Sequence, residues 1–72
     1  MPILPSLKPK EIEKILLKHK FILKRQTGSH RVYFNQTTNA TVIVSFHSRE
    51  IPRGTLASIV KQSKLQIKEF TK

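Results

Sequence analysis

The sequence contains no cysteine, no tryptophan and no aspartate, and these absences exclude several kinds of function. Without cysteine there are no disulfides and no thiolate metal sites, which fits a cytoplasmic protein. The only acidic residues are four glutamates, too few for a carboxylate-bound metal site or the paired carboxylates of a glycosidase. No apolar run approaches the roughly 20 residues of a membrane span. Residues 1–5 lack the charged-then-apolar order of a signal peptide.

Positive charge dominates the composition. Fourteen lysines and arginines stand against four acids, giving a net charge of +10 on 72 residues. Such a surface favours a polyanionic partner. Nucleic acid is the better candidate than an anionic membrane, because neither helical segment has the Trp/Phe-rich face of an interfacial helix. We expect a single domain over residues 1–72, with an extended lead-in at 1–8.

Hydrophobic periodicity predicts two helices around three strands. A first helix starts near Pro9 and carries one buried stripe, formed by Ile12, Ile15, Leu16 and His19. Lys10, Lys14 and Lys18 lie on its solvated side. Strands are expected at residues 21–26, 29–35 and 40–47, and a second helix from Gly54–Thr55. Leu65, Ile67 and Phe70 would lie back over the core in a short terminal turn or helix. The order predicts an α+β fold of the α-β-β-β-α type, with a three-stranded antiparallel sheet and two helices packed on one face.

Strict alternation assigns the strand residues to two faces of the sheet. We expect the first strand to be half-buried, and Val42 and Val44 to face the helices. His30 would share its side with Val32 and Phe34. The residues expected on the open side are Arg31, Tyr33, Ile43, Ser45 and His47. There Tyr33 would pack across the strands against Ile43, or stack on a base.

The meander brings distant residues to one end of the sheet. The start of the second strand and the end of the third should be adjacent, so His30 and His47 are expected to be neighbours. Both helix N-termini, with their partial positive charge, should point to this end. Arg31, Arg49 and Arg53 would join them. The arrangement predicts a phosphate-binding corner.

The segment Gln26–Arg31 holds a glycine turn, a hydroxyl, an imidazole and a guanidinium. Imidazole both accepts and donates protons near neutral pH, and a guanidinium suits phosphate. His30 is therefore either a catalytic residue or a solvated residue at the start of a strand.

Several motifs together resemble the HicA-type toxins of HicAB toxin–antitoxin pairs. They are Lys8-Pro9-Lys10-Glu11, Thr27-Gly28-Ser29-His30-Arg31, His47 after the third strand, and Gly54-Thr55-Leu56 with Ile59 and Gln62 in the second helix. The resemblance implies a double-stranded-RNA-binding-like fold, ribosome-independent cleavage of messenger RNA, and a single catalytic histidine at His30. The family usually has glycine where this chain has Lys20 and Lys64, positions that favour left-handed backbone.

These observations predict a ribonuclease that needs no metal and no cofactor. The RNA 2′-OH would attack its own phosphate, with His30 as the principal proton-transfer residue. His47 is the candidate second histidine, although alternation places it on the other face from His30. The residues expected to bind or orient RNA phosphate are Lys24, Arg25, Ser29, Arg31 and Arg53. The alternative is a non-catalytic RNA- or DNA-binding module of the same fold.

The resemblance also implies a protein partner, a HicB-type antitoxin. The charge of this chain predicts that the partner is acidic. We expect it to cover the His30 corner. Binding along the outer face of the first helix, through Lys10, Lys14 and Lys18, is the alternative.

Overall fold

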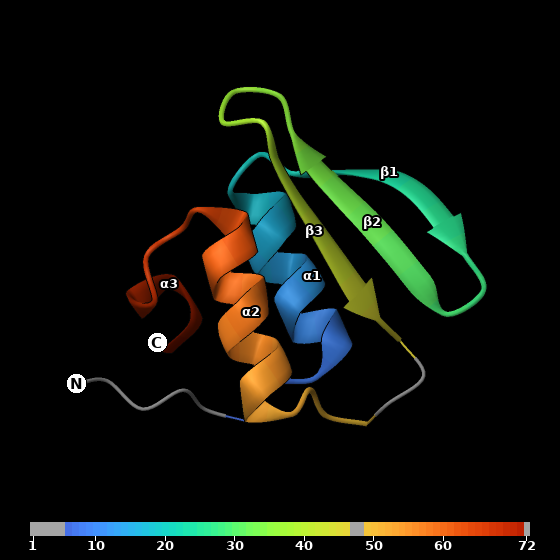
Figure 1. Cartoon of the computed structure of the whole chain (residues 1–72), viewed down its shortest axis with the longest axis vertical. Helices are drawn as coiled ribbons and strands as arrows, with labels where there is room; N and C mark the ends of the chain where they lie inside the picture. Colours follow the sequence, from blue (N-terminus) through green and yellow to red (C-terminus); the bar gives the residue numbers. More distant parts are fainter. Residues whose placement is uncertain (1–5, 47–48, 72) are drawn as a thin grey trace.

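The computed structural model describes residues 6–46 and 49–71 (Figure 1). In chain order its elements are α1 Pro9–Lys18, β1 Ile22–Thr27, β2 His30–Asn35, β3 Ala40–Ser45, α2 Arg53–Ser63 and α3 Lys68–Thr71. The predicted α-β-β-β-α order, with helices packed against a three-stranded antiparallel sheet, is confirmed. The short α3 is the terminal turn or helix that was expected over the core. The predicted third strand ran on to His47, which lies outside the described residues.

Helix α1 begins at a proline and buries the predicted stripe. Pro9 stands in the first turn, where a missing N–H costs nothing, and the Glu11 carboxylate accepts the backbone N–H of Lys8 at 2.8 Å. Ile12 and Leu16 are fully buried. The lysines of the opposite side, Lys10, Lys14 and Lys18, are exposed. The helix is therefore amphipathic in the sense that the spacing predicted.

Two lysines occupy backbone positions that usually favour glycine. Lys20, just after α1, has a φ of 70°, and Lys64, which caps the C-terminus of α2, has a φ of 62°. These are the positions where the resembled family usually has glycine, and the left-handed backbone expected there is confirmed. The Lys64 ammonium donates a hydrogen bond to the carbonyl of Thr38 at 2.9 Å, which ties the end of α2 to the β2–β3 loop.

The strands are ordered β1-β2-β3, and each neighbouring pair is antiparallel. A two-residue turn, Gly28-Ser29, joins β1 to β2, and Thr27 pairs with His30 across it. Gly28 has a φ of 58°, which the turn requires and which glycine adopts without strain. The turn therefore fixes the position of His30 at the first residue of β2.

Asn35 organises the other end of β2, although it is a polar residue in the core. Its side chain is 5% exposed. The side-chain oxygen accepts the backbone N–H groups of Thr37 and Thr38, at 2.8 and 3.1 Å, which shapes the β2–β3 loop. The side-chain amide donates to the carbonyl of His19 at 3.0 Å and so joins this loop to the end of α1. Each of these bonds satisfies a group that burial would otherwise penalise.

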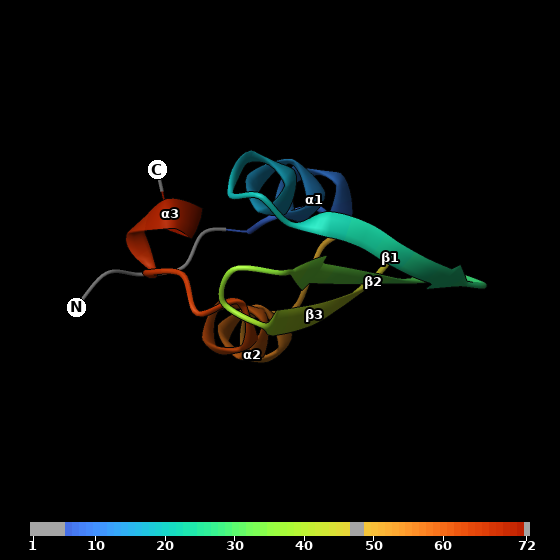
Figure 2. The ribbon, with the colours of Figure 1, turned by 90° about the horizontal axis from the view of Figure 1, so that it is seen from above.

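The sheet has a covered face, toward the helices, and an open face. Residues of β2 and β3 on the covered face are Arg31, Tyr33, Asn35, Ala40, Val42 and Val44, and those on the open face are His30, Val32, Phe34, Thr41, Ile43 and Ser45. Figure 1 shows α1 and α2 on the same side of the sheet, and Figure 2 shows this arrangement from above. The prediction for β3 is confirmed, since Val42 and Val44 are buried and Ile43 is exposed.

The prediction for β2 is wrong. Tyr33 is 0% exposed and lies across from Val42, so it neither faces solvent nor packs on Ile43. Arg31 lies on the same covered face, across from Val44. Because residues 32–34 are all apolar, alternation fits either orientation of this strand.

The expectation that β1 is half-buried is also wrong, because all six of its residues are exposed. Phe21 is buried, but it precedes the strand. A β-bulge between Leu23 and Arg25 interrupts the pairing with β2. β1 is an edge strand, and both α1 and α2 pack against β3 at the opposite edge. The helices therefore leave β1 without a cover.

The two long helices start at one end of the molecule. Leu7 and Ile51 form an antiparallel bridge, in which the Ile51 N–H donates to the Leu7 carbonyl at 2.8 Å. This bridge holds the segment before α1 beside the segment before α2. In Figure 1 both helix N-termini lie at the end of the sheet where β3 ends, as predicted.

Candidate functional site

His30 opens β2 at the edge of the turn and lies on the open face. It pairs with Thr27 of β1 on one side and with Ser45 of β3 on the other. It is exposed. It shares its face with Val32 and Phe34, as predicted, but this face is open and not covered. An exposed imidazole at the end of the sheet is accessible to a large substrate.

The backbone of Ser29 extends the pairing beyond His30. Its carbonyl accepts the N–H of Phe46 at 2.7 Å, one residue past the end of β3. The turn that carries His30 is therefore joined to the residue that leads toward the helix N-termini. Ser29 itself is half-buried.

Arg31 points away from His30, into an internal polar cluster. Its guanidinium donates to a Glu13 carboxylate oxygen of α1 at 2.8 Å. The Tyr33 hydroxyl donates to the same oxygen. The guanidinium carbon of Arg31 also lies 4.2 Å from the centroid of the Phe46 ring. Arg31 is thus held on the covered face, on the other side of the sheet from His30.

The electrostatics of this cluster follow from burial and from the shared carboxylate. Burial of Tyr33, and then its hydrogen bond to Glu13, raise the pKa of the phenol well above its ordinary value of 10.0. Tyr33 and Glu13 together raise the pKa of Arg31, so the guanidinium stays charged. The cluster therefore joins α1 to β2 with a neutral phenol, a carboxylate and a permanent cation.

Lys24 and Arg25 lie on the same side of the sheet as His30. Arg25 is paired with Val32 of the open face. Lys24 sits in the bulge, and its ammonium is 4.8 Å from the centroid of the Phe34 ring. Arg25, Lys24, Val32 and Thr41 line one shallow hollow of about 330 Å³. Two of the predicted phosphate-binding residues are therefore beside the open face.

Just beyond the end of β3, Arg49 is the one described residue of the predicted basic corner that lines a hollow. A hollow of about 350 Å³ there is lined by Lys8, Pro9, Lys10, Phe46 and Arg49. Arg53 is exposed and begins α2 at this end of the molecule. Phe46 lines the hollow on one side and bonds to Ser29 on the other, which connects the corner to the turn of His30. His47 belongs to the undescribed residues, so its position relative to His30 stays a prediction.

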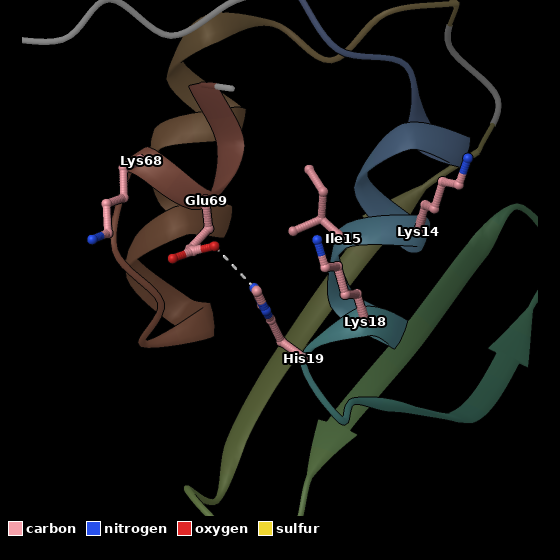
Figure 3. A pocket seen from close by; sticks show the side chains of 6 residues that line it. All are labelled: Lys14, Ile15, Lys18, His19, Lys68 and Glu69. Atoms are coloured by element: carbon pink, nitrogen blue, oxygen red, sulfur yellow. Dashed lines mark hydrogen bonds and ion pairs between the residues drawn. The ribbon is translucent and has the colours of Figure 1, made fainter.

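A hollow of about 530 Å³ lies away from His30, between α1 and α3 (Figure 3). Its lining is Lys14, Ile15, Lys18, His19, Lys68 and Glu69. His19 is half-buried, as expected for the end of the α1 stripe, and its Nε2 is 3.1 Å from a Glu69 oxygen. Among the described residues, no three His or Glu side chains are grouped to hold a metal ion.

Two residues that matter for the site were not singled out from the sequence. Glu13 was counted only among the four glutamates, and Phe46 fell only within the range of the third strand, although both contact Arg31. A signal existed for Glu13. It lies one residue from the buried Ile12 and three before Leu16, so its side chain borders the apolar stripe.

A three-stranded antiparallel sheet with helices on one face, in α-β-β-β-α order, defines a double-stranded-RNA-binding-like fold. The family model of the HicA toxin of bacterial toxin–antitoxin systems matches residues 9–65. This span runs from the first residue of α1 to beyond the end of α2. The chain therefore belongs to the HicA toxin family, and the resemblance inferred from its motifs is confirmed.

Family membership implies a HicB-type antitoxin as the partner of this chain. A search of curated proteins found no match. No helix in the described part of the chain is long and apolar enough to cross a membrane.

Proposed function

We propose that this toxin is an endoribonuclease that cleaves messenger RNA without a metal ion and without the ribosome, with His30 as the catalytic residue. The observation that carries the proposal is the position of His30. It is an exposed imidazole on the open face, the face that also carries Lys24 and Arg25 of β1, in a chain of the HicA family. No acidic residue occurs between Lys14 and Arg49, so nothing in these strands repels the RNA backbone.

The reaction is an attack of the RNA 2′-OH on the adjacent phosphate. His30 takes the proton of the 2′-OH while its oxygen bonds to phosphorus. The bond from phosphorus to the 5′ oxygen breaks, and that oxygen receives a proton. The products are a 2′,3′-cyclic phosphate and a 5′-hydroxyl end. His47 stays the candidate acid that supplies this proton. The prediction that put His47 and His30 on opposite faces of the sheet depended on the face assignment of β2, which was wrong.

The phosphate needs cations as charge grows on its oxygens. Arg25 is the described candidate on the open face, and Arg53 is the candidate at the corner. Lys24 lies beside Phe34 and would bind a phosphate farther along the RNA. Ser29 would orient the phosphate at the turn. Arg31 would contribute at longer range, because Glu13 already binds its guanidinium on the covered face.

Metal independence is proposed from the carboxylates themselves. Three of the four glutamates have another role: Glu11 caps α1, Glu13 binds Arg31 and Tyr33, and Glu69 pairs with His19. Hard cations such as Mg²⁺ need several oxygen ligands in one place. Each of these three carboxylates binds a different partner, and the three do not meet at one place where they could hold a metal ion.

Digestion of an end-labelled RNA tests the proposal. We expect shorter products in excess EDTA, with cyclic-phosphate or 3′-phosphate ends. Oligonucleotides of DNA and of 2′-deoxy RNA should bind without being cut, because they lack the nucleophile. A band shift of RNA with unchanged length would instead identify the alternative, a non-catalytic binding module. Loss of cleavage in EDTA that Mg²⁺ restores would refute the mechanism.

We further propose that the HicB-type antitoxin is acidic and covers the His30 corner. A partner there would block RNA entry with a small interface, and a carboxylate could pair with Arg53. The other candidate surface is the outer side of α1, where Lys10, Lys14 and Lys18 are exposed. Modification of histidines by diethyl pyrocarbonate, in the free toxin and in the complex, distinguishes these two surfaces. In the complex, His30 should lose its reactivity, whereas unchanged reactivity in a fully inhibited complex would show that the antitoxin acts elsewhere.

A further inference from the structure

The open face carries a patch of large apolar side chains that the helices leave uncovered. Ile22 and Ile43 are each 52% exposed. Between them lie Val32 and Phe34 of β2, which are partly exposed. The register joins these residues, because Ile22 pairs with Phe34 and Val32 pairs with Ile43. Contiguous exposed apolar surface of this kind marks an interaction site on a small protein.

The charged residues at the rim of this patch are all basic. Lys20, Lys24 and Arg25 border it, and the chain has no acid between residues 14 and 49. Two hollows flank Phe34. One, of about 260 Å³, has Phe34 and Ile22 beside Lys20. The other, of about 330 Å³, has Val32 beside Lys24 and Arg25. Each hollow therefore combines an apolar surface with at least one cation.

This combination fits nucleotides. A base offers a planar apolar surface that stacks on an aromatic ring, and its phosphate is attracted to an adjacent cation. A purely anionic ligand would leave the apolar patch unused, and a purely apolar ligand would leave the cations without a partner. The open face complements both parts of a nucleic-acid strand.

The patch is continuous with His30 along β2. Phe34 is four positions after His30 in β2, and four steps at the rise of a strand correspond to a distance of about 13 Å. Both side chains project from the open face. An RNA strand of several nucleotides would span this distance, at about 3.4 Å for each stacked nucleotide.

We propose that the open face binds the single-stranded RNA that flanks the scissile phosphate, with Phe34 as the platform for one base and Lys24 as a contact to its phosphate. The ring of Phe34 is now approached by the Lys24 ammonium, at 4.8 Å. A base would take that place on the ring, and Lys24 would move onto the phosphate. The exchange is favourable because base stacking is stronger than an exposed contact between a lysine and an aromatic ring. The position of the scissile phosphate rests on the proposed function, but the binding site does not.

The test measures binding apart from cleavage. In a His30→Ala background, the affinity for a fluorescent single-stranded RNA of 12 nucleotides is measured by anisotropy at several salt concentrations. Phe34→Leu keeps an apolar side chain of similar size but removes the ring, and should weaken binding roughly tenfold. Phe34→Tyr keeps the ring and should bind as the parent does. Lys24→Gln should lower the slope of log affinity against log salt by about one.

Matched controls lie off this face. Leu17 of α1 is 50% exposed, so Leu17→Ser removes an exposed apolar group elsewhere. Lys61 of α2 is exposed, so Lys61→Gln removes one charge elsewhere. We expect neither to change the affinity or the salt slope by as much as the open-face variants. Circular dichroism and thermal melting of every variant establish that it is folded.

The outcomes separate this inference from the proposed function. A folded Phe34→Leu variant whose RNA affinity stays within twofold of the parent overturns the inference, even if His30 cleaves RNA. Binding that depends on Phe34 supports it, even if no cleavage is found. If Phe34→Leu and Lys24→Gln weaken only the binding of a HicB-type protein, the open face belongs to that partner and the inference is wrong.

Discussion

Replacing Glu13 by alanine tests the cluster that joins α1 to β2. The Glu13 carboxylate accepts hydrogen bonds from Arg31 and Tyr33, which are neighbours on the covered face. Tyr33 is 0% exposed, so its hydroxyl has no contact with solvent in the intact protein and depends on Glu13 as its acceptor. An unsatisfied buried hydroxyl costs about 1–3 kcal/mol. The partly exposed ion pair adds at most about 1 kcal/mol.

We therefore expect Glu13→Ala to lower the free energy of unfolding by about 2–3 kcal/mol. For a domain of this size the melting temperature should fall by roughly 10–20 °C. Urea denaturation followed by circular dichroism measures the first quantity, and thermal melting measures the second. Glu11→Ala is the matched control. Glu11 is an exposed acid of the same helix that accepts one backbone N–H, so its loss should cost about 1 kcal/mol or less.

A double-mutant cycle isolates the Tyr33–Glu13 bond. Tyr33→Phe removes the hydroxyl, so adding Glu13→Ala then leaves no unsatisfied donor on this ring. The double variant should be more stable than the sum of the single losses predicts, by about 1 kcal/mol. If the two losses simply add, or if Glu13→Ala is as mild as Glu11→Ala, the reasoning about this cluster is refuted.

Three further predictions concern stability. Because the pKa of Tyr33 is raised in the fold, the unfolded state ionises first as pH rises above 10.0, so the free energy of unfolding should decline there. Tyr33→Phe should remove this part of the alkaline decline, and an unchanged profile would contradict the assigned cause. Lys20→Gly should raise the free energy of unfolding by about 0.5–1 kcal/mol, because the φ of 70° strains lysine but not glycine. Gly28→Ala should lower the free energy of unfolding by about 1 kcal/mol through backbone strain alone, because Gly28 has a φ of 58° and open space around it. Denaturant curves in which Lys20→Gly is destabilising or Gly28→Ala is stabilising would refute this reasoning.

The sequence was sufficient for the elements and their order. Three local patterns each indicate a single structure, and each structure is present as predicted. They are the stripe of Ile12 and Leu16 in α1, the turn at Gly28 and the β-branched residues of β3. The shared end of the sheet followed from connectivity, because an antiparallel meander leaves no other arrangement. The position of His30 at the start of β2 followed from the same turn.

The faces of β2 did not follow from the sequence. Residues 32–34 are apolar on both sides of the strand, so burial of either side satisfies the pattern. The choice is made by tertiary contacts: Tyr33 reaches Glu13, and Arg31 reaches both Glu13 and Phe46. Such contacts join residues far apart in the chain, and alternation contains no information about them. The exposure of β1 was missed for a related reason, since its place at the uncovered edge depends on where the helices pack.

The rate at which His30→Ala cleaves a labelled RNA in excess EDTA tests the central claim most directly. We expect it to fall by at least about 10², the contribution of one positioned acid–base group. His30 is exposed at the start of a strand, so the free energy of unfolding should change by less than about 1 kcal/mol. His19→Gln, which alters a histidine paired with Glu69 away from the open face, should retain the rate of the unmodified protein. A folded His30→Ala variant that cleaves RNA at the rate of the unmodified protein would contradict the account.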